Sequence, residues 1–302
     1  MATVEHMDRS GGRPVDRLWV LLIAGRRLMG VWASALLLAS CGADQDPTRQ
    51  GDGWATDRVP ERGGVPSLVI DFEAGAATGA PITGIDASVG RARASAVSLG
   101  GGQILTAVGA DGGAAARFPS NTESAVGVRA VFRVGLSDSA ALSPGRGGFQ
   151  FGVDLMYPDG VAWDSAGDDG DNVFQRGLFG DRGQFKLQVD QGRPACRIAG
   201  GERETLVTAE ATLAPDQWYR LLCQRSDDEV TIFVAELGSP WERLSWTSWS
   251  VSDRAGAIPP SQESVPVSIG GKLNRQGEIV RDAPDQFSGV LDNVVFRSLK
   301  ER

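Results

Sequence analysis

Acidic residues stand in two short alternating runs near the two ends of the sequence: Asp71 and Glu73 in LVIDFEAG, and Asp292 in DQFSGVLDNVVF. Ca²⁺ takes about six to eight oxygen ligands, mostly from carboxylates and backbone carbonyls. If the strands that carry these three residues pair, their carboxylates converge and can hold a structural Ca²⁺. The alternative is a solvated acidic edge on two neighbouring strands.

Three tryptophans, Trp241, Trp246 and Trp249, lie in a long connection rich in Ser and Pro. An exposed Trp can form a flat platform for a sugar ring, because it combines apolar area with an N–H donor. Large aromatic residues are mostly buried, which favours instead the packing of this connection onto a sheet. Trp246 and Trp249 are therefore candidate ligand-binding residues, with core packing as the alternative.

The residue combinations of common hydrolases are missing from the sequence. The single histidine, His6, lies in a segment that we expect to be removed, which excludes Ser-His-Asp catalysis and His-ligated zinc. A retaining glycosidase needs two carboxyl groups about 5–5.5 Å apart. The best local candidate, Asp154, has no Glu two residues before it and none just after it. We therefore expect no catalytic residues.

Beyond Val65 the sequence consists of short runs in which apolar and polar residues alternate, separated by Gly, Pro, Asp and Ser clusters. Alternation with a period of two is typical of half-buried antiparallel strands, and no stretch has a convincing helical period. The pattern predicts an all-β protein, a two-sheet antiparallel β-sandwich or jelly roll. Clear examples of the runs are 126–134, 185–189, 219–223, 230–234 and 290–296.

An apolar run ends in Leu36-Leu37-Leu38-Ala39-Ser40-Cys41. This segment resembles the lipobox of bacterial lipoproteins, whose cysteine receives a diacylglycerol and becomes the N-terminus. The preceding Arg26-Arg27 pair gives the basic and then hydrophobic order of a signal peptide. The resemblance implies a signal peptide over 1–40 and a lipid anchor at Cys41 on the extracytoplasmic side of the cell membrane. Residues 41–64, without apolar periodicity, are expected to form a disordered tether.

The chain after residue 40 carries 25 Lys and Arg against 35 Asp and Glu. Contacts with phosphates require clustered basic residues, so this balance argues against nucleic acid as a partner. It is compatible with a soluble domain that binds cations.

Three cysteines are present in the sequence. If Cys41 carries the lipid, Cys196 and Cys223 remain as a pair in an oxidising compartment. A bridge between them would contribute roughly 3–4 kcal/mol on the chain-entropy model. The alternative is two buried free thiols.

Four segments resemble the laminin G-like domains of bacterial secreted proteins, which have the concanavalin A-like lectin/glucanase fold. The resemblance implies one domain over 65–302, a Cys196–Cys223 bridge and pairing of the first and last strands. It implies no activity, because this fold hosts enzymes, lectins and adhesion modules. The segments are DNVFQRGLFGDRGQFKLQVDQGRPACRIAG (171–200), LAPDQWYRLLCQRSDDEVTIFV (213–234), SVPVSIGGK (264–272) and DQFSGVLDNVVF (285–296).

These features predict a lipid-anchored, extracytoplasmic binding module that is not an enzyme. Its expected ligand is a carbohydrate or another cell-surface component, and its expected metal is a structural Ca²⁺. Two alternatives stay open, a divergent glycan-active enzyme of the same fold and a purely structural adhesion module.

Replacing the lipobox cysteine tests the predicted anchor. In the Cys41→Ser variant the thiol that would receive the lipid is absent, so we expect the protein to leave the membrane fraction for the soluble fraction. Fractionation and blotting measure this change. A variant that still sediments with lipid would show that Cys41 is not the anchor.

Overall fold

The computed structural model describes residues 60, 64–73, 77–120, 127–160, 170–181, 183–201, 203–238, 244–252, 256–258, 266–282 and 285–299. The predicted signal peptide, Cys41, most of the predicted tether and Trp241 lie outside these residues. In the part of the chain that is described, no helix has the length and apolar character of a membrane span.

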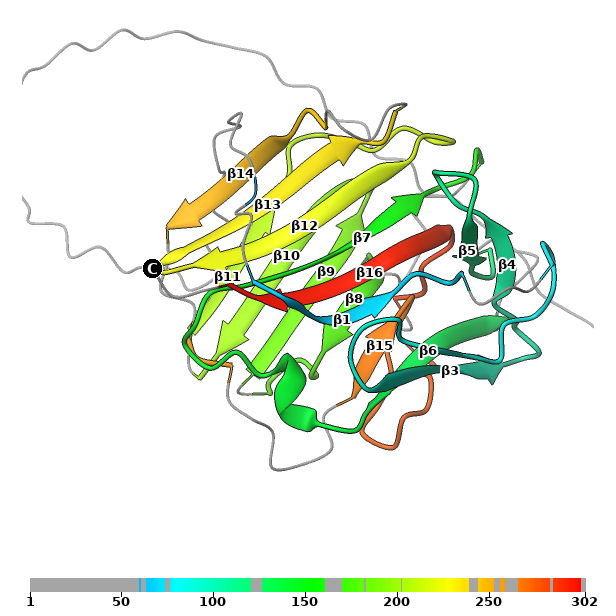
Figure 1. The fold of residues 1–302 in the computed structure, drawn as a ribbon, viewed down its shortest axis with the longest axis horizontal. Coiled ribbons are helices and arrows are strands. Elements are labelled where there is room, and N and C mark those ends of the chain that lie inside the picture. Colours follow the sequence, from blue (N-terminus) through cyan, green and yellow to red (C-terminus); the bar gives the residue numbers. More distant parts are fainter. Residues whose placement is uncertain are drawn as a thin grey trace, which may run out of the picture. The chain divides into compact units, whose positions relative to one another are not determined.

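Two antiparallel sheets of eight strands each form the fold and confirm the predicted all-β class (Figure 1). A single 3-10 turn, η2 (Ser139–Leu142), also occurs among the described residues. The first sheet has the order β14 (Thr247–Ser252), β13 (Glu229–Glu236), β12 (Tyr219–Ser226), β7 (Phe149–Met156), β16 (Val290–Ser298), β5 (Ala114–Arg117) and β4 (Leu105–Val108), with β1 (Pro66–Ile70) also paired to β16. The second sheet has the order β11 (Arg203–Thr208), β10 (Arg193–Gly200), β9 (Gly183–Asp190), β8 (Asp171–Arg176), β15 (Val267–Ile269), β6 (Arg129–Leu136), β3 (Ala92–Leu99) and β2 (Gly84–Asp86).

The core lies between the two sheets, where alternate side chains of each strand meet. Phe185 on β9 is at its centre, with ring centroids 4.6 Å from Phe151, 5.6 Å from Phe149 and 5.4 Å from Phe296. All four rings are fully buried. The alternation of apolar and polar residues in the sequence therefore corresponds to side chains that point alternately into this core and toward the outer faces of the sheets.

A disulfide between Cys196 and Cys223 crosses the core. Cys196 is on β10 of the second sheet and Cys223 is on β12 of the first, with their Cα atoms 5.7 Å apart. The bridge therefore joins the two sheets covalently, as the resemblance implied.

The first and last strands pair, as the resemblance also implied: Val69 of β1 is the cross-strand partner of Val295, and Ile70 of Val294. In contrast, the prediction of a long connection around the tryptophans is wrong in part. Strand β14 occupies Thr247–Ser252 and pairs with β13 at the edge of the first sheet. Its sequence, TSWSVS, is polar at alternate positions, which suits an edge strand with one face toward the core.

Candidate functional site

Four carboxylates gather where β1, β7, β16 and the β4–β5 turn meet. Asp154 on β7 and Asp292 on β16 are direct cross-strand partners. Glu73 follows β1 and accepts a hydrogen bond from the backbone N–H of Ala114 at 3.1 Å, and Asp111 lies in the turn between β4 and β5. We call Glu73, Asp111, Asp154 and Asp292 the acidic cluster.

The two inner members of the cluster are almost completely buried, Asp154 at 0% and Asp292 at 1% exposure. Arg220 of β12 binds Asp154 with two hydrogen bonds of 2.6 Å, and the Asn293 side chain donates a third at 2.9 Å. Asp292 Oδ1 accepts the backbone N–H of Asn293 at 2.7 Å. Asp292 Oδ2 has no hydrogen-bond donor among the described residues, and the β4–β5 turn covers it so closely that a Cβ on Gly109 would lie 2.7 Å away.

Burial raises the pKa of Asp292 from 3.8 to about 7, because the charged carboxylate loses its hydration. The negative charges of Asp154, Asp111 and Glu73 contribute to this raised pKa, while the hydrogen bond from the Asn293 backbone opposes it. The pKa of Asp154 is also raised, by burial first, against the opposing effect of Arg220. Among the described residues, Arg220 is the one basic side chain that pairs with a member of the cluster.

The structure brings Glu73 and Asp292 of the predicted metal set to one place. Asp71 Oδ1 instead accepts a long hydrogen bond, 3.5 Å, from the backbone N–H of Glu73. No group of three or more acidic, His or Cys side chains in the described ranges is arranged to hold a metal ion. Asp111 and Asp154 were not predicted as neighbours of this site, although Asp154 stands in an alternating run and therefore had a recognisable strand position.

The two candidate tryptophans lie on opposite sides of the first sheet. Trp249 on β14 points into the core at 2% exposure, so it offers no exposed ring face. Trp246, just before β14, is half-buried, and its ring makes an edge contact with Phe233 at 6.2 Å between centroids. Phe233 alternates with the core residues Ile232 and Val234, which places it on the side away from the second sheet. We call that side the outer face.

A polar row crosses the outer face, in register over five neighbouring strands. Gln150 and Gln224 share a hydrogen bond of 3.1 Å, and Thr231 and Ser250 share one of 2.9 Å. Arg297 begins the row, and its buried Nε has no hydrogen-bond partner among the described residues. Successive cross-strand partners are Arg297, Gln150, Gln224, Thr231 and Ser250.

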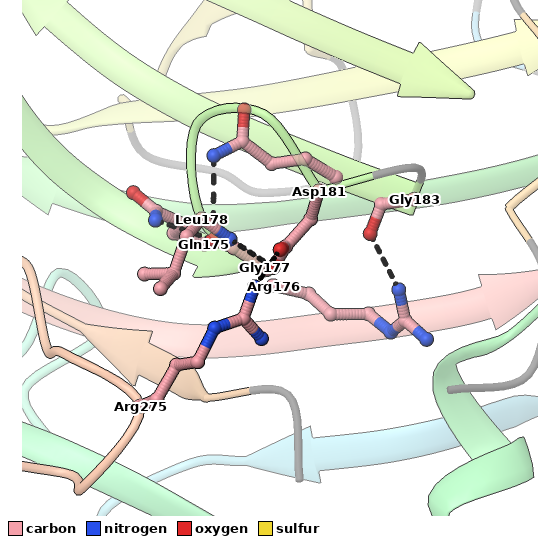
Figure 2. A network of polar contacts seen from close by, with 8 residues as sticks. Gln175, Arg176, Gly177, Leu178, Asp181, Gly183 and Arg275 are labelled. Atoms are coloured by element: carbon pink, nitrogen blue, oxygen red, sulfur yellow. Dashed lines mark hydrogen bonds and ion pairs between the residues drawn. The ribbon is translucent and has the colours of Figure 1, made fainter. Parts of the chain in front are cut away.

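The first segment that resembles laminin G-like domains, 171–200, spans β8, β9 and β10 and includes the turn between β8 and β9. Arg176 donates to the Gly183 carbonyl at 2.7 Å, and Asp181 pairs with Arg275 from the other side of the turn (Figure 2). Gly177 has a φ of 84°, which only glycine adopts without strain. These side chains fix the shape of the turn, so we assign this motif a structural role.

Comparisons with known proteins bear on the fold alone. No protein-family model matches the sequence, and no curated protein matches it. Among solved structures, the LG1-3 region of the laminin alpha2 chain is 12% identical with a TM-score of 0.40, covering 57% of this chain and 31% of that one. The chain thus spans less than a third of the laminin fragment.

Two further structures are similar over a larger part of this chain. A protein of unknown function from Shewanella oneidensis MR-1 is 13% identical with a TM-score of 0.40, covering 77% of this chain and 85% of that one. The enzymatically active domain of tailspike protein 2 from bacteriophage CBA120 is 9% identical with a TM-score of 0.44, covering 77% and 31%. At these values no function follows for this chain.

Replacing Asp292 by the isosteric Asn tests its raised pKa. Unfolded Asp292 ionises near pH 4 and folded Asp292 near pH 7, so its contribution to stability is present at acid pH and falls as the pH rises between these values. In chelator, Asp292→Asn should therefore be more stable than wild type at pH 8, by on the order of 4 kcal/mol, and close to it at pH 4. Urea unfolding at both pH values measures this.

The exposed Asp111 provides a matched control. Asp111→Asn removes one negative charge from the same cluster without removing a buried carboxylate, so it should give a much smaller pH-dependent difference. An Asp292→Asn variant that is equally or less stable than wild type at pH 8 would contradict the assigned pKa.

Proposed function

We propose that this chain is a non-catalytic binding module, held at the extracytoplasmic face of the cell membrane through Cys41, and that its outer face binds carbohydrate. The observation that carries the proposal is the half-buried Trp246 on this face, with the half-buried Arg297 four strands away at the start of the polar row. An aromatic ring packs against the C–H face of a sugar, and a guanidinium donates hydrogen bonds to its oxygens.

The polar row supports a carbohydrate ligand over a protein partner with an apolar surface. Its amide and hydroxyl groups form hydrogen bonds in two pairs, Gln150 with Gln224 and Thr231 with Ser250, and Gln150, Gln224 and Thr231 are at most 4% exposed, so they form a rigid base under this face. Rigid placement reduces the ordering cost of binding. A purely structural adhesion module would not require this polar face.

An enzyme of the same fold is the second candidate, because Asp292 has the pKa of a general acid and lies beside a second carboxylate. The burial of both groups opposes this function, since a glycosidic bond must reach the two carboxyls directly. Release of reducing ends from a polysaccharide would show that the chain is an enzyme and not only a binding module.

Binding to a polysaccharide panel tests the function. We expect the processed chain to bind at least one glycan, and Trp246→Ala to weaken that binding by about 10-fold or more, as for an aromatic contact residue. Isothermal titration measures the affinity, and melting curves confirm that the variant is folded.

Phe179→Ala is the control, because Phe179 is an aromatic residue at 84% exposure in the β8–β9 turn of the other sheet. Its affinity should equal that of wild type. If no polysaccharide binds, or if Trp246→Ala binds as tightly as wild type, the outer face is not a carbohydrate site.

We also propose that the acidic cluster holds a structural Ca²⁺. Asp292 is 1% exposed and a hydrogen bond from the described residues reaches only its Oδ1, while Glu73 and Asp111 supply further carboxylates from two other segments. A divalent cation would supply the positive charge that the cluster lacks. Asp292 and Glu73 would be its side-chain ligands, and because no three such side chains in the described ranges are arranged around one ion, backbone carbonyls and water would complete the coordination.

Melting with and without Ca²⁺ tests this site. At pH 8, where Asp292 is ionised, millimolar Ca²⁺ should raise the melting temperature of wild type over that in chelator, because a ligand of the folded state alone stabilises it. The shift should vanish in Asp292→Asn and shrink at pH 6, where protons compete for the same oxygen. If the melting temperature of wild type does not change with Ca²⁺, the acidic cluster does not bind this ion.

A further inference from the structure

An amine, a carboxylate and a carboxamide meet where β8 begins in the second sheet. Asp285 Oδ2 lies 2.8 Å from Lys272 Nζ and accepts a hydrogen bond of 3.0 Å from Nδ2 of Asn172. Asn172 is the second residue of β8, Lys272 follows β15, and Asp285 precedes β16. We call these three residues the Lys–Asp–Asn triad. One carboxylate oxygen of the triad thus contacts both an amine nitrogen and an amide nitrogen.

Backbone hydrogen bonds hold the three segments of the triad together. The Asn172 N–H donates to the Asp285 carbonyl at 2.9 Å, and the Gly270 N–H donates to the Val173 carbonyl at 3.0 Å. The Phe287 N–H donates in turn to the Gly270 carbonyl at 3.2 Å. Because the main chain already fixes these segments, little further entropy is lost when their side chains react with one another.

Two members of the triad are shielded from solvent. Asn172 and Asp285 are 0% and 1% exposed, whereas the Lys272 side chain is 27% exposed. Water is therefore excluded from the Asn172 carboxamide, where it would compete with an amine as the nucleophile. The partly open lysine end leaves a way out for a small product.

The backbone and the polar atoms of the triad are not those of an ion pair that serves stability alone. Asp285 has a φ of 42°, a left-handed conformation that costs energy for a residue with a side chain. Asn172 Oδ1 and Asp285 Oδ1 are buried, and neither has a hydrogen-bond partner in the described ranges. Strain and unpaired buried acceptors lower stability, so their presence at one site indicates a further role.

We propose that Lys272 and Asn172 become joined by an intramolecular isopeptide bond, with Asp285 as the catalytic residue that transfers the protons. The observation that carries the proposal is the contact of one Asp285 oxygen with both the attacking nitrogen, Nζ, and the departing nitrogen, Nδ2. The flexible four-carbon stem of lysine lets Nζ move from this oxygen to the neighbouring Asn172 Cγ. The bond lies in the second sheet and does not depend on a ligand at the outer face.

The reaction needs no oxidant, reductant or further reactant. Asp285 first takes a proton from the Lys272 ammonium, which frees the lone pair of Nζ. Nζ then forms a bond to Asn172 Cγ and the bond from Cγ to Nδ2 breaks, while Asp285 passes protons from Nζ to Nδ2. An ammonium ion leaves, Asp285 is again a carboxylate, and the chain has lost the mass of ammonia, about 17 Da.

Peptide mapping of the full chain by mass spectrometry tests the bond. Without it, trypsin releases Asn172 in the peptide 147–176 and Lys272 at the end of the peptide 255–272. An acylated Lys272 is not a cleavage site, so wild type should give a branched peptide in which 147–176 is joined to 255–275. Its mass should be about 17 Da below that of the two linear peptides together. Both linear peptides should be largely lost.

Three variants assign the roles of the side chains. Lys272→Arg keeps a positive charge beside Asp285 without a nucleophilic amine, so it should give only linear peptides. Asp285→Asn keeps the amine and the carboxamide but removes the proton carrier, so it should also lose the branched peptide. Lys186→Arg is the matched control, because Lys186 is a half-buried lysine on β9 of the same sheet. This control should form the branched peptide as completely as wild type.

Linear peptides alone from wild type would overturn the proposal and leave the triad as a buried ion pair. A branched peptide that joins 255–275 to 282–297, about 18 Da lighter than its parts, would place the bond on Asp285 and overturn the assignment to Asn172. If Asp285→Asn, folded by its melting curve, forms the bond as completely as wild type, Asp285 is not the catalytic residue. None of these results bears on binding of polysaccharide or Ca²⁺.

Discussion

The pairing of β16 with β7 is the constraint on which the acidic cluster depends. The register shifts between Asp292 and Val295, and Asn293 within the shift has a φ of 49°. Such a bulge places one more residue on one strand than on its partner, and Asn tolerates the left-handed conformation better than most residues. As a result, the Asn293 side chain binds Asp154 while the adjacent Asp292 faces the same carboxylate across the strands.

The same first sheet separates two chemically different surfaces. Its inner side carries the phenylalanine core and the bridge to Cys196, whereas its outer side carries the polar row. Trp246 and Trp249 illustrate the separation, because Trp249 belongs to the core whereas Trp246, just before β14, contacts Phe233 on the outer side.

Much of the fold could be predicted from the sequence, because alternation reports directly on which side of a sheet is buried. Pairing of the first and last strands, and with it the approach of Glu73 to Asp292, followed from a motif resemblance. The role of Asp154 could not be predicted, since it depends on a strand register fixed by a bulge that no short pattern announces. Similarly, TSWSVS has too few apolar residues to be recognised as a strand, so the two tryptophans could not be assigned to opposite faces.

The buried carboxylates of the acidic cluster contribute little to the stability of the fold. Replacing a buried ion pair by apolar residues is often neutral or stabilising, so Asp154 and Arg220 are weak determinants of stability. Ionised Asp292 is less favourable still, because burial removes its hydration and three acidic side chains lie near it. A cation bound to Asp292 would offset both effects and would link β16 to Glu73, which follows β1, and to the β4–β5 turn. Because a cation binds the ionised carboxylate, protons compete with it for Asp292 as the pH falls through the raised pKa.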